Sequence, residues 1–459
     1  MFVGFDYGSA NCAVGVIEQG EVKLLPLSGD SNYLVSTLYA FDRDLISEAV
    51  YRALPQAQQA EYAKLRSAEL SRARAARQAL DLEPNEQAVF VGDEAVKQYL
   101  EMPEEGFYVR SPKSFLGATG LRVDQVALFE DIVTIMMLHI KACADKLLAA
   151  KGETITHGVI GRPVNFQGIG GEESNRQAEQ ILTRAAHRAG FTQVDFLFEP
   201  IAAGMDFEAS LQSDQTVLVV DVGGGTTDCS VVKMGPSHIK KRDRSDDFLG
   251  HSGQRIGGND LDIALAMKAF MPHLGLHSKM VNGLPVPSKP FWNAVAVNDI
   301  SAQRDFSSLT SATLIKDLIK DAERADLLHL LLKVQRDHLG YRMVRSAEQV
   351  KIALSDREQT RQSLSYIAAG LEACVDQAQF IEAIAQPINQ IQNLMAQALA
   401  PANTEPDLIY VTGGSAKSPA IYNAIAACYP GIEIVVGDHF GSVTAGLTRW
   451  AQRRFAGEL

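Results

Sequence analysis

Two glycine-rich turns that each carry an aspartate are the part of this sequence whose residue types and spacing point to chemistry. They lie in VGFDYGSANCAVGV (3–16) and VVDVGGGTTDCSVV (219–232), between apolar, strand-like arms. In each turn an aspartate, Asp6 or Asp221, stands two residues before the first glycine. Glycine lets a turn adopt conformations closed to other residues, and the clustered amides form a nest for anions such as phosphate.

An aspartate beside a phosphate repels it unless a cation stands between them. Asp6 and Asp221 therefore imply Mg²⁺ held through its waters, which that ion gives up reluctantly. Thr226 and Thr227 add hydroxyl donors to the second turn. A structural β-turn is the alternative for a single glycine run. The repeated aspartate spacing favours two hairpins that face one another across a cleft and hold a triphosphate from both sides.

A third glycine pair lies in YVTGGSAKSP (410–419), after a strand-like segment and before a helical one. Backbone amides at the start of a helix point outward and bind phosphate or nucleoside groups. This pair is a further candidate contact for the same cleft.

The elements that must position these turns follow one plan given twice, with insertions: three strands, a helix, a strand and a helix. The first half reads as strands 2–7, 12–17 and 22–27, helical 43–83, strand and turn 88–96, helix 122–150, strand 156–164 and helix 172–190. The second half reads as strand 216–224, a mainly helical insertion 250–380 with 278–300 least regular, strand 407–415, helix 419–428, strand 432–437 and a helix to about 455. This order predicts a mixed α/β fold of two pseudo-symmetric halves.

Composition narrows the classes of function. The chain has 459 residues, of which 46% are hydrophobic and 21% charged, as in an ordinary globular protein with a sizeable core. Its formal net charge of −12 argues against a nucleic-acid surface. No apolar stretch approaches the ~20 residues of a membrane span. We expect no cleavable leader, because Met1 is followed directly by a strand-like segment without a basic lead. The cysteines are scattered without metal-ligand spacing, so we expect a reduced, cytoplasmic protein.

Several motifs in order resemble the nucleotide-binding domain of DnaK-type heat-shock chaperones. They are the two turns, FEPIAAG (198–204), RIGGNDLD (255–262), AEQVKIALS (347–355) and VTGGSAKSP (411–419). The resemblance covers residues 1 to about 450, except for added segments at roughly 42–85 and 275–345. It implies an α/β, actin-like ATPase fold: two pseudo-symmetric lobes of ribonuclease-H-like topology around a central nucleotide cleft.

The resemblance also implies lobe boundaries. Lobe I would span 1–212, with its core at 1–40 and 120–212 and an upper insertion at about 41–119. Lobe II would span 213–459, with its core at 213–250 and 380–459 and an upper insertion at about 251–379.

Roles for single residues follow from the same resemblance. Lys113 matches a lysine that meets the γ-phosphate and the attacking water, and Glu199 a carboxylate that helps to place that water. Asp228 matches the carboxylate near the metal or potassium site, and Thr226 joins these as an expected catalytic residue. The expected Mg²⁺ residues are Asp6 and Asp221. The expected nucleotide contacts are Gly8, Ser9, Ala10, Asn11, Gly223, Gly224, Gly225, Thr226, Thr227, Gly257, Gly258, Glu348, Lys351, Ser355, Gly413, Gly414, Ser415 and Lys417.

Departures from the family's pattern concern the residues expected to recognise the base more than those expected to bind the phosphates. Ser9 replaces a threonine and keeps its hydroxyl. Lys417 stands where an arginine usually stacks on adenine, and lysine has no planar face. Ile352 replaces another arginine, and DHFGSVTAG (438–446) lacks the usual aspartate–glutamate–alanine run. We therefore expect weak or altered base recognition.

A full chaperone of this family continues into a linker, a peptide-binding β-sandwich and a helical lid. This sequence stops at WAQRRFAGEL (450–459), so we expect it to resemble short chaperone-like bacterial relatives without a peptide-binding domain. Pro163 and Arg176 match the pair that relays nucleotide state to that domain. They would relay a lobe rotation to a separate, unidentified protein partner or client.

The leading hypothesis is a slow Mg²⁺-dependent ATPase of chaperone type that binds ATP and ADP and acts through a protein partner, without nucleic acid or membrane. One alternative is a kinase for a sugar or acid metabolite, which would need an aspartate base and an acceptor pocket. The other is an actin-like filament or scaffold protein, for which the large upper insertion of lobe II makes head-to-tail stacking awkward.

Overall fold

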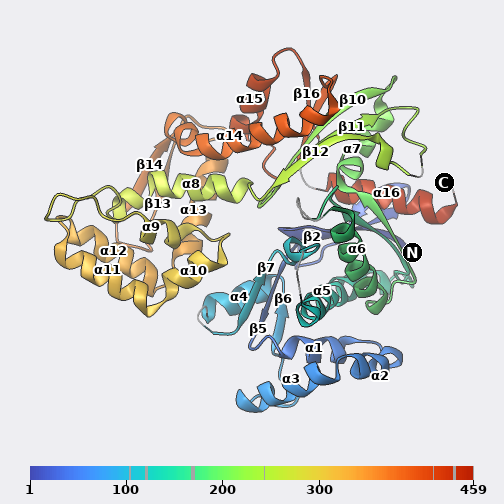
Figure 1. Ribbon diagram of the computed structural model, residues 1–459, viewed down its shortest axis with the longest axis horizontal. Helices are drawn as coiled ribbons and strands as arrows, with labels where there is room; N and C mark the ends of the chain where they lie inside the picture. Colours follow the sequence, from blue (N-terminus) through green and yellow to red (C-terminus); the bar gives the residue numbers. More distant parts are fainter. Residues whose placement is uncertain are drawn as a thin grey trace.

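The computed structural model describes residues 1–102, 105–118, 122–166, 171–241, 243–416, 418–437 and 441–457. Two β-sheets form the centre of the molecule, and mainly helical insertions extend from them (Figure 1). The first sheet has the strand order β3-β2-β1-β8-β9, with β4 beside β2, and the second has the order β12-β11-β10-β15-β16. The strands of the first sheet are β1 (Phe2–Tyr7), β2 (Asn11–Glu18), β3 (Glu21–Leu24), β4 (Leu34–Val35), β8 (His157–Arg162) and β9 (Gln193–Phe198). Those of the second are β10 (Gln215–Val222), β11 (Thr227–Met234), β12 (Phe248–Gln254), β15 (Leu408–Thr412) and β16 (Glu433–Val436).

Both sheets have the same topology. β1 and β2 form an antiparallel hairpin, as do β10 and β11, and β8 and β15 join β1 and β10 in parallel. The helices that alternate with these strands are α5 (Val123–Ala149), α6 (Gly171–Arg188) and α7 (Glu199–Ser210) in the first half, and α14 (Gln377–Ala402), α15 (Pro419–Cys428) and α16 (Ser442–Ala456) in the second. The predicted repeat of three strands, a helix, a strand and a helix is confirmed, and the fold is that of an actin-like ATPase.

Helices α7 and α16 pack against each other where the two halves meet. They approach closely at Gly446, where an added Cβ would lie 2.0 Å from the carbonyl oxygen of Ala202. Val159 of the first sheet and Val219 of the second belong to one buried cluster with Leu447 of α16. Burial of apolar surface contributes roughly 25 cal/mol per Å². This shared core therefore fixes the two hairpins relative to each other.

The first insertion extends downward in Figure 1 and contains a three-stranded sheet in the order β6-β5-β7. Its elements are β5 (Thr37–Ala40), α1 (Leu45–Ala53), α2 (Gln56–Leu65), α3 (Ser67–Ala79), β6 (Val89–Val91), α4 (Asp93–Glu101), β7 (Phe107–Arg110) and a 3₁₀ turn, Pro112–Phe115. The helices α1 to α3 confirm the predicted helical segment 43–83. The strand predicted within 88–96 is confirmed as β6, and a helix rather than only a turn follows it from Asp93.

The second insertion is mainly helical, as predicted. Its elements are α8 (Gly258–Ala269), α9 (Lys289–Val295), α10 (Ile300–Ser307), α11 (Leu309–Asp321), α12 (Ala325–Arg336), α13 (Gly340–Ala353), β13 (Gln359–Ser363) and β14 (Glu372–Asp376). Short 3₁₀ turns lie at Ser245–Asp247 and Met271–Leu274. Within the described ranges, no helix is both long enough and apolar enough to cross a membrane.

Candidate functional site

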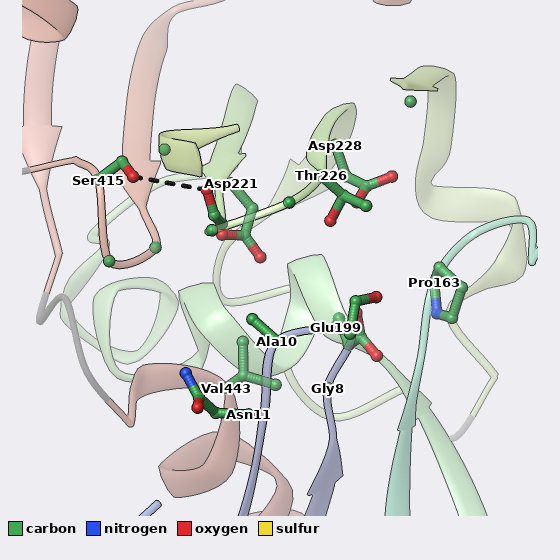
Figure 2. A pocket seen from close by; sticks show the side chains of 18 of the residues that line it. Gly8, Ala10, Asn11, Pro163, Glu199, Asp221, Thr226, Asp228, Ser415 and Val443 are labelled. Carbon is green, nitrogen blue, oxygen red and sulfur yellow. Dashed lines mark hydrogen bonds between the residues drawn. The ribbon is translucent and has the colours of Figure 1, made fainter. Parts of the chain in front are cut away.

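The tips of the two hairpins line one cavity of about 850 Å³. Figure 2 shows Gly8, Ala10 and Asn11 on one wall, facing Asp221 and Thr226 on the other. The walls come close, because a Cβ added to Gly224 would lie 3.4 Å from the Cβ of Ala10. The β1–β2 and β10–β11 turns, more than 200 positions apart in the sequence, therefore form the floor of a single cleft.

The second hairpin turn presents its amides to this cavity. The first residues of α8 hold the turn from behind, since the amides of Gly258 and Asn259 donate to the carbonyls of Gly223 (2.9 Å) and Gly224 (2.7 Å). A larger residue at Gly257 would not fit, because its Cβ would lie 2.7 Å from the Gly223 oxygen. With the carbonyls held, the amides of Gly224, Gly225 and Thr226 have no recorded partner among the residues that the structure describes.

The first turn is held in the same way from its own side. The hydroxyl of Ser36 donates to the Gly8 carbonyl at 2.7 Å, and the amide of Ser36 donates to the Ala10 carbonyl at 2.9 Å. The amides of Ser9 and Ala10 have no recorded partner within the described part of the chain. The floor thus offers free amide donors from both halves, which is the arrangement of an anion nest.

A buried lysine and four acidic residues surround the same space. Lys113 is 7% exposed and forms an ion pair with Glu199. Burial is the main cause that raises the pKa of Asp6, Asp221 and Asp228, each to about 7. The Glu199 carboxylate raises these pKa values further, while the Lys113 ammonium lowers them.

For the pKa of Lys113, the effect of neighbouring charges is larger than the effect of burial. Burial lowers its pKa, but the surrounding carboxylates outweigh burial and the net shift is upward. The ammonium therefore stays charged at neutral pH. The clustered carboxylates, by contrast, favour either protonation or a further cation in the cleft, because each relieves their mutual repulsion.

The acidic residues fit a cation held through water. No group of three or more His, Cys, Asp or Glu side chains in the described ranges is close enough to ligate a metal directly. Mg²⁺ usually keeps several waters and is bound through one or two carboxylates together with substrate phosphates. Asp6 and Asp221, on opposite walls of the cleft, are suited to that mode.

The other end of the cavity is lined by α13 and by the loop after β15. Glu348, Lys351 and Ile352 of α13 line it, as do Gly413 to Ser415. The Ser415 hydroxyl donates to the Gly223 carbonyl at 3.5 Å, which ties this loop to the second hairpin turn (Figure 2). Lys351 pairs with Asp262 of α8 at 2.8 Å. α13 and α8 thus close the cleft from the insertion side.

Side chains from the two insertions meet near this cleft. Arg110, at the end of β7, donates to the Val297 carbonyl at 2.9 Å and lies over the ring of Tyr341, with its guanidinium carbon 5.9 Å from the ring centre. Tyr99 stacks on Tyr108 and approaches Tyr341 edge-on, with ring centres 6.0 Å apart in the second pair. We call these five residues, Tyr99, Tyr108, Arg110, Val297 and Tyr341, the rim contacts.

Comparison with protein families finds a match for part of the chain. Residues 119–274 match the model of the Hsp70 protein family. This match supports an Hsp70/DnaK-type family with an actin-like nucleotide-binding domain. The matched segment contains Glu199, the second hairpin turn and the start of α8. The match suggests a chaperone-type, ATP-binding protein, since Hsp70 proteins in general bind ATP or ADP together with a divalent metal.

Most residues expected to act in the Hsp70-type cleft line its cavity. These are Asp6, Gly8, Ser9, Ala10, Asn11, Lys113, Pro163, Glu199, Asp221, Gly223, Gly224, Gly225, Thr226, Asp228, Gly258, Glu348, Lys351, Gly413, Gly414 and Ser415. Their location agrees with the expected roles, which stay predictions. Lys417 lies outside the described residues.

Four expected residues are not among those that line the cavity. The hydroxyl of Thr227 is buried and donates to the Ile256 carbonyl at 2.7 Å, so it is not available to phosphate. Ser355 lies in the turn just after α13, where its hydroxyl donates to the carbonyl of Lys351 in the last turn of that helix. Gly257 lies under the second turn, where its amide donates to Asp260. Arg176 is exposed on α6.

The Hsp70-type cleft also contains residues that the sequence reasoning missed. Asn259 lines it, next to Gly258 in RIGGNDLD, where the motif itself was a signal. Arg110 and Tyr33 line it from the first half and carry no recognisable local pattern. Ser442, at the start of α16, lines it and lies 2.9 Å from the Thr412 hydroxyl, although its segment departs from the family's pattern.

Proposed function

We propose that this chain is a Mg²⁺-dependent ATPase that binds ATP between two lobes, 1–212 and 213–459, and hydrolyses it. The observation that carries the proposal is the single cavity in which free amides of both hairpin turns meet the buried Lys113–Glu199 pair. Hydrogen bonds to charged groups contribute about 1.5–3 kcal/mol each, so these amides together would anchor a triphosphate.

Hydrolysis needs positioning and charge neutralisation more than covalent chemistry. The amides of Gly224 and Ala10 hold phosphate oxygens from opposite walls. Lys113 places its ammonium beside the γ-phosphate and offsets charge on the transferred group. Glu199 accepts a hydrogen bond from the attacking water and orients it. The water oxygen bonds to the γ-phosphorus while the bond to the bridging oxygen breaks, and the proton that the water loses passes to an oxygen of the transferred phosphate, which leaves ADP and hydrogen phosphate. Mg²⁺, held by Asp6 and Asp221 through water, would neutralise phosphate charge.

Substitution of Lys113 tests this assignment. Lys113→Ala should lower single-turnover hydrolysis by about 100-fold or more, because transition-state charge loses its neutralising partner. ATP binding should fall only modestly, since the amides remain. The control is Lys151→Ala, because Lys151 is half-exposed, follows the end of α5 and does not line the cavity. Unchanged turnover in Lys113→Ala would remove this lysine from the mechanism.

We also propose that residues 163–166 relay nucleotide state to a protein partner. Pro163 lines the cavity, and Arg162 holds its loop by donating to the Pro163 and Val164 carbonyls, each at 3.1 Å. Arg162 also pairs with Glu179 of α6, the helix that carries Arg176 on its exposed face. A shift of the loop at the γ-phosphate would therefore move α6.

Affinity capture of partner proteins tests whether nucleotide state is relayed. The chain saturated with ATP should retain a partner that the ADP-bound chain releases, or the reverse, and Arg176→Ala should weaken that difference. Identical capture in both nucleotide states would contradict the relay. All five cysteines are free, which agrees with the cytoplasmic location that we propose.

A further inference from the structure

A second cavity, of about 350 Å³, is lined by residues of α13, of β13 and of the loop that follows β13. Figure 1 shows α13 and β13 in the second insertion. The walls of this cavity are Arg342, Arg345, Ser346, Gln349, Gln362, Ser363, Ser365 and Tyr366. None of these eight residues is acidic, and all carry hydrogen-bond donors. The volume lies within the range of about 300–1,000 Å³ for small-molecule sites. A cavity with two guanidinium groups and no carboxylate favours an anion.

Arg342 is already fixed in this cavity. Its guanidinium lies 4.3 Å from the centre of the Tyr366 ring. The Tyr366 hydroxyl in turn lies 3.1 Å from the hydroxyl of the buried Ser346. No ion pair is recorded for Arg342 within the described part of the chain. A guanidinium stacked on a ring keeps its in-plane N–H groups free, and these match the oxygens of a phosphate.

Arg345 connects this cavity to the nucleotide cleft. It forms an ion pair with Glu348 at 2.7 Å, one turn along α13. Arg345 lines the second cavity, whereas Glu348 lines the cleft. The Arg345 side chain is 75% exposed, so its present bond is weak and can be exchanged. An anion in the second cavity would compete with Glu348 for the same guanidinium.

We propose that this second cavity binds a small phosphomonoester, whose phosphate bonds Arg342 and draws Arg345 away from Glu348. Two arginines and a small volume suit one phosphate on a small molecule. The released Glu348 carboxylate would then accept a hydrogen bond from a nucleoside hydroxyl, which rests on the proposed function. The phosphomonoester therefore tightens nucleotide binding, and by linkage the nucleotide tightens phosphomonoester binding by the same factor.

Titration with glycerol 3-phosphate tests the site. The full chain is saturated with Mg-ADP, so that the hairpin turns are not free to bind the probe, and binding is measured by calorimetry with glycerol as the uncharged control. Arg342→Gln with Arg345→Gln should weaken binding at least about tenfold, through loss of charge-assisted hydrogen bonds. Arg361→Gln is the matched control, because Arg361 lies on β13, is 72% exposed and does not line the cavity. Equal binding by the double variant and the parent chain would overturn the site.

A second measurement tests the coupling. Glycerol 3-phosphate at saturation should tighten ADP binding about fivefold. Glu348→Gln should still bind glycerol 3-phosphate, but the probe should no longer tighten ADP binding. The neutral amide of this variant forms no ion pair with Arg345 that the probe could break. An unchanged ADP affinity in the parent chain would overturn the coupling. If ADP does not bind at all, the proposed function is wrong. The arginine variants are then compared with the parent chain without nucleotide, and this comparison tests the second cavity independently of the proposed function.

Discussion

The floor and the rim of the cleft are built from different interactions. The floor, formed by the two hairpin turns with Lys113 and Glu199, has buried charges and free amides whose backbone is fixed from behind. The rim contacts are aromatic pairs and one arginine, which join the two insertions across the cleft. Buried, charge-assisted hydrogen bonds contribute about 1.5–3 kcal/mol each, and aromatic pairs about 0.5–1.5 kcal/mol.

From this difference we expect the floor to bind the ligand and the rim to move. The floor cannot rearrange without breaking several hydrogen bonds and exposing buried charge. The rim can open at the cost of a few weak contacts. Changes in the floor should therefore alter affinity and chemistry, whereas changes in the rim should alter the rate at which nucleotide enters and leaves.

The largest effect outside the hydrolytic step is expected for Asp221→Asn in the floor. Loss of a charge that faces the metal should weaken Mg-ATP binding by about 10- to 100-fold, equivalent to one charge-assisted hydrogen bond. Calorimetry with and without EDTA measures this, and Asp30→Asn, an exposed aspartate, is the control. Equally tight binding by the parent chain in EDTA would show that the metal assignment is wrong.

A smaller effect is expected for Tyr341→Ala at the rim. The variant loses ring contacts with Arg110 and Tyr99, so bound nucleotide should dissociate about tenfold faster. Stopped-flow release of a fluorescent ADP analogue measures the rate. The release rate of Tyr341→Phe, which keeps the ring, should lie between the rates of the parent chain and of Tyr341→Ala. The comparison between floor and rim breaks down if Tyr341→Ala changes single-turnover hydrolysis but not release.

The smallest effect concerns the base. Ile352 is 60% exposed at the edge of the cavity and offers no planar cation. Ile352→Arg should raise the preference for ATP over GTP by roughly threefold, since an exposed cation–π contact contributes about 0.5–1 kcal/mol. Competition binding of the two nucleotides measures it. Sub-micromolar, strongly adenine-selective binding by the parent chain would contradict the expectation of weak base recognition.

Local patterns were enough to locate the hairpins. Asp6 and Asp221 were found because each stands two residues before the first glycine of a turn between apolar strands. Such a pattern involves only residues that are close together in the chain. The helix predicted at 419–428 matches α15 for the same reason. Thr227 was misjudged because alternate residues of a strand face opposite sides, and only the fold shows that its hydroxyl faces Ile256.

The sequence by itself determined the two glycine-rich turns proposed to bind phosphate, the repeated order of strands and helices, and the candidate acidic residues, because each depends on residues close together in the chain. The tertiary structure alone decided that Lys351 is paired with Asp262, 89 positions away, and that Arg110 reaches Val297, 187 positions away. It also decided that α13 separates two cavities. These features arise where distant segments pack, and neither spacing nor composition encodes which side chains meet there.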